Sequence, residues 1–341
     1  MGTLSRRGFL GTAIGGAALS GMAAKAVAQQ PGYGLPTRRL GRTNEQVSVL
    51  CLGGGHIGMV GKREDEALAI RMMHRAIDEG INFFDSAWAY GEGYSDEVIG
   101  KALKGGKRQK VFLMTKNSGR DMEFSQRCLE DSLRRLQVDH IDLWQFHEIN
   151  FDNDPDWVFE RGGLKFALQA QKEGKVRFIG FTGHKDPRIH NKMLNKGYDW
   201  ATSQMPISPL DYYFRSFQKE VIPVCLAKDV GVIGMKSLGG SVDGTPKNSM
   251  ILENTNLTAE HCLRFALDVP VSSIVRGWTN MDQMMADIRT ARSHTQLTER
   301  ERGEILMLAE PHAGDGRYEL FKSTRRFDMP LYKEMHGFPT D

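Results

Sequence analysis

From residue 47 to residue 292 the chain alternates short apolar runs with longer stretches in which apolar residues recur every three to four positions. The short runs have the length of β-strands, and the longer stretches have the period of amphipathic helices. We therefore predict eight strands, each followed by a helical stretch. The strands are expected at residues 47–55, 81–87, 111–116, 141–148, 177–183, 200–208, 232–238 and 272–279.

Continuously apolar strands that are separated by helices are typical of a parallel sheet, and eight such units favour a closed (β/α)8 barrel. The alternative is a doubly wound sheet, but no G-x-G-x-x-G follows the first strand and no P-loop is present. "LPTRRLGRTNEQVS" (35–48) is predicted to form a hairpin below the barrel, and "TERERGEILMLAE" (298–310) an extra helix. The tail after that helix is expected to fold over the top. We predict one barrel domain over residues 29–341.

The first 28 residues are expected to lie outside the barrel. Arg6-Arg7 precedes Phe9-Leu10 and a Gly/Ala-rich apolar stretch, which ends in the A-x-A pattern of a cleavage site at Ala28. The segment resembles a twin-arginine export signal. An uncleaved membrane anchor is the alternative, but the stretch is rich in glycine and only weakly apolar. We expect removal after Ala28, the twin-arginine translocase as a transient partner, no permanent membrane anchor, and a periplasmic or extracellular location.

Charge and cysteine content exclude several classes of function. The formal net charge of +3 falls to zero on removal of the signal, which holds three cations and no acid. The remaining chain has no basic excess of the kind that nucleic acids attract. The four cysteines are far apart and form no C-x-x-C motif, which argues against a zinc or iron–sulfur site. We predict no metal site and no disulfides; the buried free thiols would be Cys51, Cys128, Cys225 and Cys262.

Three consecutive predicted strands end in residues that carry chemistry. Asp85, Lys116 and His147 end the second, third and fourth strands, at intervals of 31 residues. The active sites of such barrels lie at the carboxyl ends of the strands. Tyr90 follows in the loop after the second strand and can reach back to that end. We therefore expect these four side chains to meet.

Such a group is suited to acid–base chemistry. Asp85 would hold Lys116 charged, and an ammonium about 4 Å from Tyr90 would favour its phenolate by up to roughly 4 kcal/mol at an effective dielectric near 20. We expect this interaction to lower the pKa of Tyr90 and make it a general acid, with neutral His147 orienting the substrate oxygen. Taken singly, the residues have ordinary explanations as a helix cap, a solvated lysine or a core histidine. Their combined spacing favours catalysis.

The chain from about residue 40 to residue 292 resembles the aldo-keto reductases. "GINFFDSAWAYGEGYSDEVIGKAL" matches the family pattern D-x-A-x-x-Y-G-x-x-x-x-E-x-x-x-G, while "MTK" and "DLWQFH" match its lysine and histidine blocks. The resemblance implies reversible hydride transfer between a nicotinamide cofactor and a carbonyl or alcohol. NADP(H) is the favoured cofactor and NAD(H) the alternative. The implied catalytic tetrad is Asp85, Tyr90, Lys116 and His147.

The resemblance also implies residues near the nicotinamide. Thr182 and Gln204 stand at two positions where the family binds the carboxamide, but Gly183 replaces an asparagine. We hypothesise that His184 supplies the missing contact; a solvated loop histidine is the alternative. Met235 stands where the family usually stacks a tyrosine on the ring, and a thioether also packs on ring faces.

The rest of the cofactor is expected along two turns. Lys236 with Leu238 and Gly240 would contact the pyrophosphate, although the lysine is equally well explained as a surface charge. After the eighth strand, Arg276 replaces a family proline and Asp287 replaces an asparagine, two departures that bear on the family's usual NADPH preference. Arg276 would bind the 2′-phosphate if it pointed outward. The neighbours of the adenosine are predicted to be Arg276, Gly277, Thr279, Gln283 and Asp287.

Substrate selection is assigned to the loops at the barrel mouth. Trp88 and Trp144 are the predicted contacts, with the loop 150–163 and the tail 317–327, for an aldehyde, ketone or sugar. Glu148 is expected either to tune the protonation of His147 or to face solvent. Two other functions stay open: a nicotinamide-binding redox sensor with little turnover, and a barrel isomerase or aldolase that uses Lys116 as a Schiff-base amine.

Overall fold

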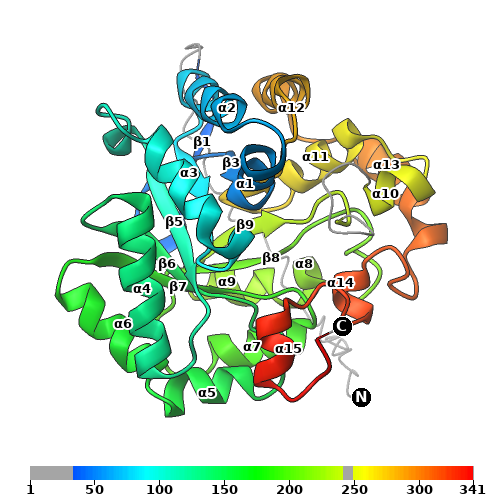
Figure 1. Cartoon of the computed structure of the whole chain (residues 1–341). Coiled ribbons are helices and arrows are strands. Elements are labelled where there is room, and N and C mark those ends of the chain that lie inside the picture. Colours follow the sequence, from blue (N-terminus) through cyan, green and yellow to red (C-terminus); the bar gives the residue numbers. More distant parts are fainter. Residues whose placement is uncertain (1–33, 241–248, 341) are drawn as a thin grey trace, which may run out of the picture. The chain divides into compact units, whose positions relative to one another are not determined.

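The eight central strands form a closed parallel barrel in the computed structural model, which describes residues 34–240 and 249–340 (Figure 1). Neighbours around the barrel follow the order β10-β3-β4-β5-β6-β7-β8-β9. This confirms the predicted (β/α)8 barrel. The strands are β3 (Leu50–Gly53), β4 (Phe83–Asp85), β5 (Phe112–Asn117), β6 (Ile141–Phe146), β7 (Val176–Thr182), β8 (Thr202–Pro206), β9 (Gly231–Met235) and β10 (Ser273–Arg276).

Helices surround the barrel (Figure 1). Those that follow the first five barrel strands are α1 (Gly54–Arg63), α2 (Glu66–Asp78), α3 (Tyr94–Ala102), α4 (Met122–Leu136), α5 (Asp154–Glu160), α6 (Gly163–Lys172) and α7 (Pro187–Leu194). The later ones are α8 (Phe217–Glu220), α9 (Ile222–Ala227), α10 (Met250–Asn254), α11 (Ala259–Asp268), α12 (Met281–Ser293), α13 (Glu299–Ala309), α14 (Leu320–Ser323) and α15 (Pro330–Met335).

Side chains along each strand alternate between the barrel interior and the layer under the helices. The interior cluster includes Cys51, Phe83, Met114, Leu143 and Ile233. Asp85 lies two positions after Phe83, and Lys116 lies two positions after Met114. His147 lies four positions after Leu143. The same alternation therefore turns all three inward, at the carboxyl end of the barrel.

The amino-terminal end of the barrel is closed by the predicted hairpin. Strands β1 (Thr37–Arg39) and β2 (Gln46–Ser48) pair antiparallel. Leu40 and Val47 are fully buried and belong to the interior cluster. Burial of these two side chains fills the bottom of the barrel, so the functional end lies opposite.

The extra C-terminal helix is also present, as α13. It begins with a capping box between Thr298 and Glu301. In the tail that follows, the fully buried Lys322 pairs with Asp211 at 2.6 Å. The Phe327 ring lies against Gly240, just beyond β9. These contacts hold the tail across the carboxyl end of the barrel.

Helices α1 and α5 occupy stretches that were predicted as a turn and a loop. Helix α1 begins inside the glycine run 53–55, which reads as a turn because glycine is a poor helix former. A Cβ at Gly54 would stand 2.3 Å from the carbonyl oxygen of Asp85, so the close approach of β4 requires glycine there. Helix α5 occupies the expected loop 150–163 and carries Pro155 in its first turn, where proline is tolerated.

Three further sequence predictions relate to the chain as a whole. All four cysteines are buried free thiols, as expected. Within the described residues, no helix has the length and apolar character needed to cross a membrane. The proposed export signal, residues 1–28, lies outside the described residues.

Candidate active site

The structure brings Asp85, Tyr90, Lys116 and His147 together at the carboxyl end of the barrel. The Lys116 Nζ forms an ion pair with Asp85, donates to the Ser86 carbonyl at 2.7 Å and lies 3.3 Å from the Tyr90 hydroxyl. The rings of Tyr90 and His147 meet edge to face, with centroids 5.4 Å apart. Asp85 and Lys116 are 2% and 1% exposed, so their ion pair is shielded from water.

Lys116 is held in its charged form. Burial alone would lower the pKa of this lysine, but the adjacent Asp85 and Tyr90 more than offset it and raise the pKa above its ordinary value. The site therefore contains a permanent ammonium beside a phenol.

Tyr90 differs from the sequence prediction. Burial raises the pKa of its hydroxyl above 10, and the opposing effect of Lys116 is smaller. The expectation that Lys116 brings this pKa down is wrong for this structure, because desolvation of the phenolate outweighs the attraction of the ammonium. At neutral pH Tyr90 is thus protonated and is able to donate a proton.

His147 is neutral. Burial, together with the charges of Lys116 and Arg120, lowers its pKa well below 6.5. Its ring lies edge to face against Tyr332 as well, with centroids 5.7 Å apart. The buried Nδ1 has no hydrogen-bond partner among the described residues. A neutral imidazole in this place is able to orient an oxygen without adding charge.

Arg120 supports the histidine, a role that the strand spacing did not indicate. Its guanidinium is fully buried, pairs with Asp154 at 2.8 Å and donates to the carbonyls of His147 and Glu148 at 2.8 and 3.0 Å. The contact links the loop after β5 to the loop after β6. Arg120 therefore positions the backbone that carries His147.

The residues expected near a nicotinamide also gather beside Asp85. Gln204 Nε2 lies 3.3 Å from Asp85 Oδ2 and 3.7 Å from Met235 Sδ. Thr182 Oγ1 contacts the same sulfur at 4.0 Å, a weak interaction that leaves the hydroxyl able to bind a carboxamide. The absence of the family asparagine has a steric reason. A Cβ at Gly183 would stand 2.3 Å from the Ile149 carbonyl oxygen.

His184 belongs to a buried network under the C-terminal tail. Its Nε2 lies 3.1 Å from Asn150 Nδ2 and 3.3 Å from Asp328 Oδ1. Our hypothesis of a carboxamide contact is therefore not supported, because the imidazole is already engaged. Glu148, His184 and Asp328 form a group of metal-ligand type, with ligand atoms within 4.8 Å of one another. Asn150 Nδ2 stands 3.1–3.4 Å from all three, so an amide donor occupies the space between them.

The turn after β9 faces the barrel mouth. Lys236 has a left-handed backbone (φ 54°), and its Nζ lies 5.8 Å from the centre of the Phe327 ring. It is therefore not the plain surface charge considered as an alternative. A Cβ at Gly240 would meet the same ring at 3.0 Å, and Leu238 is half-buried beside it. The tail thus covers the turn that was predicted to hold a pyrophosphate.

Arg276 points inward. Its Nε and Nη2 contact Asp287 at 2.7 and 3.2 Å, and its Nη1 donates to Ser237 at 2.7 Å. Asp287 also accepts from the Trp278 indole at 2.6 Å. The two family departures compensate each other: an arginine in place of proline pairs with an aspartate in place of asparagine. Neither is free for the roles predicted at the adenosine end.

The start of α12 retains exposed polar groups. The backbone N–H and hydroxyl of Thr279 both donate to Gln283 Oε1 at 3.0 Å. A Cβ at Gly277 would stand 2.1 Å from the Nδ1 of His56, so the β10–α12 turn packs directly on α1. Thr279 and Gln283 therefore remain suitable for adenosine contacts, and Gly277 allows the turn to come close.

The two predicted substrate tryptophans do not face the tetrad. Trp144 is 1% exposed and packs on Phe146 and Phe166, in the layer under the helices. Odd-numbered residues of β6 point inward, so Trp144 points out. The Trp88 indole donates to Asp131 of α4 at 3.1 Å. Both predictions are corrected: these indoles are packing residues.

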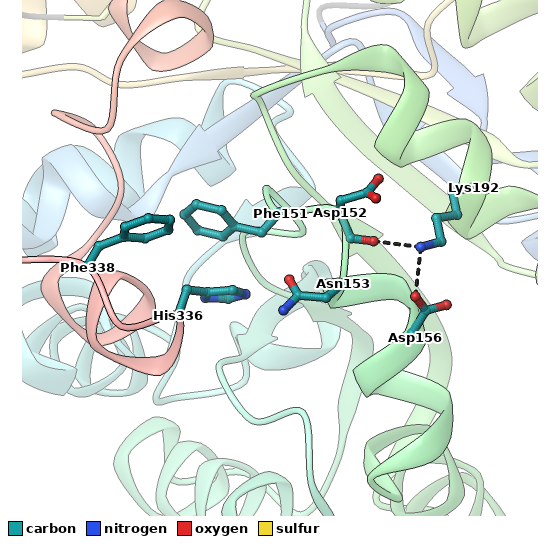
Figure 2. A pocket seen from close by; sticks show the side chains of 7 residues that line it. All are labelled: Phe151, Asp152, Asn153, Asp156, Lys192, His336 and Phe338. Atoms are coloured by element: carbon teal, nitrogen blue, oxygen red, sulfur yellow. Dashed lines mark hydrogen bonds and ion pairs between the residues drawn. The ribbon is translucent and has the colours of Figure 1, made fainter.

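A pocket of about 320 Å³ lies farther along the loop that carries His147 (Figure 2). Phe151 stacks on His336 at 4.1 Å, and Lys192 Nζ bonds the Asp152 carbonyl and the Asp156 carboxylate, both at 2.7 Å. Asp152 also pairs with an arginine, so the charges lining this pocket are matched internally. The full lining is Phe151, Asp152, Asn153, Asp156, Lys192, His336 and Phe338.

Comparison with known proteins agrees with this geometry. The model of the "Aldo/keto reductase family" matches residues 49–309. Over 230 residues the chain is 34% identical to the uncharacterized oxidoreductase YrpG of Bacillus subtilis. The matched region covers 60% of this chain and 67% of YrpG. L-galactose dehydrogenase of Arabidopsis thaliana is 26% identical over 279 residues, which cover 74% of this chain and 86% of the dehydrogenase.

Solved structures match as well. Aldo-keto reductase AKR11C1 from Bacillus halodurans, in its holo form, has a TM-score of 0.66 and 26% identity and covers 84% of this chain and 99% of its own. An aldo-keto reductase from Klebsiella pneumoniae in complex with NADPH has a TM-score of 0.65 and 22% identity, with 82% and 97% covered. With the family model spanning most of the barrel, the chain belongs to the aldo/keto reductase family.

Proposed function

We propose that this oxidoreductase transfers a hydride reversibly between NADP(H) and the carbonyl carbon of a small aldehyde, ketone or sugar. The observation that carries the proposal is the buried Lys116 ammonium, held by Asp85 and 3.3 Å from the Tyr90 hydroxyl. The bound nicotinamide supplies the hydride in reduction and accepts it in oxidation. The protein supplies the proton and the orientation.

Each residue of the tetrad has one task. As hydride reaches the carbonyl carbon, Tyr90 donates its proton to the carbonyl oxygen, so that C=O becomes CH–OH and a phenolate remains. Lys116 stabilises that phenolate, because preorganised charge acts strongly in a site shielded from water. Asp85 keeps the ammonium in place. Neutral His147 orients the carbonyl oxygen toward Tyr90.

The residues present fit a nicotinamide. Thr182 and Gln204 offer a hydroxyl and an amide for the carboxamide, and Met235 offers a thioether for the ring face. NADPH is favoured because the structurally similar reductase from Klebsiella pneumoniae was solved in complex with NADPH. NAD(H) is the alternative. A 2′-phosphate would be bound by a group other than Arg276, whose guanidinium is committed to Asp287.

Two rival functions make different predictions. A redox sensor would bind the nucleotide with little turnover. A reductase oxidises NADPH when a carbonyl compound is added, and the absorbance of NADPH follows this oxidation directly. A Schiff-base enzyme needs an uncharged lysine as nucleophile. The ion pair with Asp85 and the raised pKa of Lys116 disfavour that role.

We further propose that the chain is exported through its twin-arginine signal and acts in the periplasm or outside the cell. Support comes from the sequence pattern of residues 1–28. Free nicotinamide nucleotide is not expected there, and export of the folded protein would let it carry a tightly bound cofactor. Such an enzyme needs one substrate to oxidise and another to reduce on the same nucleotide.

The export proposal is tested on mature protein purified after native export. We expect mass spectrometry to find a sequence that starts after Ala28 and nucleotide released in stoichiometric amount. A preparation empty of nucleotide and inactive until nucleotide is added would contradict cofactor carriage. Retention of residues 1–28 in a membrane fraction would contradict cleavage. Neither result would affect the proposed reductase chemistry.

A further inference from the structure

The cations around the barrel mouth and the C-terminal tail differ in one respect. Most of them have a carboxylate partner within ion-pair distance. The pairs are Lys116 with Asp85, Arg120 with Asp154, Lys185 with Asp328, Arg276 with Asp287, and Lys322 with Asp211. Lys236, which is half-buried, differs from these five cations: no described residue forms a hydrogen bond or an ion pair with its ammonium.

Lys236 is directed into the mouth. It follows the last residue of β9, in a left-handed conformation (φ 54°) that residues other than glycine adopt rarely. The rings of Phe321 and Phe327 lie 5.5 and 5.8 Å from its Nζ. Burial has the largest effect on its pKa, and the charges of Glu148, Lys116 and two aspartates, Asp85 among them, follow. The ammonium therefore lies within the electrostatic field of the tetrad, between the tail and the barrel.

Glu148 forms no ion pair with Lys236, although its charge, when present, raises the pKa of that lysine. Burial and the nearby Asp328 raise the pKa of Glu148 to about 8, so this carboxyl is mostly protonated at neutral pH. Asp328 is already paired with Lys185 at 2.8 Å, and Asp85 with Lys116. Burial lowers the pKa of Lys236, and the charges of Glu148, Asp328 and Asp85 only partly offset it.

Lys236 is half-buried, and its ammonium has no counter-charge within ion-pair distance among the described residues. Partial burial of a cation in this way is unfavourable, and an anionic oxygen is the partner that restores the balance. We propose that Lys236 binds an anionic oxygen, of a carboxylate or a phosphate, on the molecule held in the barrel mouth. The inference rests on the proposed function and deepens it. The new assignment is a carboxylate on the carbonyl substrate. The diphosphate of the nicotinamide nucleotide, already expected at this turn from the resemblance, is the other source of the same chemistry, and the test distinguishes the two.

The test compares Lys236→Met with Lys236→Arg, which retains the charge. Lys101→Met is the matched control, because it removes a lysine that pairs with Glu66 on the outer helices. For each protein we would measure the NADPH dissociation constant by fluorescence titration. Steady-state constants would be measured with para-carboxybenzaldehyde and with its uncharged analogue, para-tolualdehyde.

A substrate carboxylate predicts that Lys236→Met raises KM for the charged aldehyde by roughly 10-fold to 100-fold, the range of one charge-assisted hydrogen bond. KM for the neutral aldehyde and the NADPH dissociation constant would stay unchanged. A cofactor phosphate predicts a rise of the same order in the NADPH dissociation constant, whichever aldehyde is used. In both cases Lys236→Arg restores much of the loss, and Lys101→Met behaves as wild type.

The inference is overturned if Lys236→Met changes neither the dissociation constant nor either KM while the wild type turns over both aldehydes. The proposed function would remain intact in that case. Wild-type protein that binds no NADPH and reduces neither aldehyde would refute the proposed function first, and the Lys236 role with it. The two failures are therefore distinguishable before any variant is compared.

Discussion

Replacement of Tyr90 by phenylalanine is expected to lower kcat for carbonyl reduction by roughly 100-fold to 10,000-fold, the usual contribution of a positioned general acid. The ring and its contact with His147 remain, but the proton donor is lost. Affinity for NADPH should not change, because the hydroxyl acts only on the substrate oxygen. Stopped-flow measurement of NADPH oxidation, together with fluorescence titration of NADPH, separates the two effects.

Tyr94→Phe is the matched control. Its hydroxyl bonds Glu66 at 2.5 Å on the outer helices and has no contact with the tetrad.

The direction of the pH dependence of the two reactions provides a second control. Because the pKa of Tyr90 is raised, reduction draws on a protonated phenol across neutral pH, whereas alcohol oxidation needs the phenolate and should accelerate as pH rises. A Tyr90→Phe variant with wild-type kcat, or an oxidation rate that falls with pH, would contradict the assignment.

Lys116→Met should damage both activity and stability. The phenolate of Tyr90 loses its stabilising charge, and Asp85 is left buried without a counter-ion. Breaking a buried pair in this way typically costs about 3–5 kcal/mol of unfolding free energy. We expect kcat to fall at least as far as in Tyr90→Phe, and urea unfolding to show the loss of stability.

The double variant Asp85→Asn/Lys116→Met separates the two roles of the lysine. Removal of both charges should recover much of the lost unfolding free energy, because no buried charge remains unpaired. Activity should stay low, since nothing stabilises the phenolate. Recovery of activity along with stability would show that Lys116 serves the fold alone.

The barrel and the meeting of the tetrad were predictable because both depend on short-range regularities. Strand and helix periods are visible along the chain, and the spacing of 31 residues places Asp85, Lys116 and His147 on adjacent strands. The misplacement of Trp144 was avoidable by the same reasoning. If His147 points inward, alternation along β6 turns residue 144 outward. The pKa of Tyr90 was predicted in the wrong direction because burial is not visible in a sequence.

Other features depend on contacts between distant segments and have no local signal. Asp328 meets His184 across 144 positions of the chain. Arg276 and Asp287 are only 11 positions apart, yet the sequence did not indicate that they would pair inside rather than face a cofactor. That Lys236 has no ion-pair partner among the described residues became apparent only when the partners of the other cations were known.

The most direct test of hydride transfer uses NADPH that carries deuterium on the nicotinamide ring carbon from which hydride leaves. The protein would be incubated with this nucleotide and an aldehyde, and the alcohol product analysed by mass spectrometry and NMR. We predict one deuterium on the carbinol carbon of each product molecule, formed by the wild type and lost with Tyr90→Phe. An alcohol without deuterium, or no nucleotide-dependent alcohol at all, would contradict the proposed function.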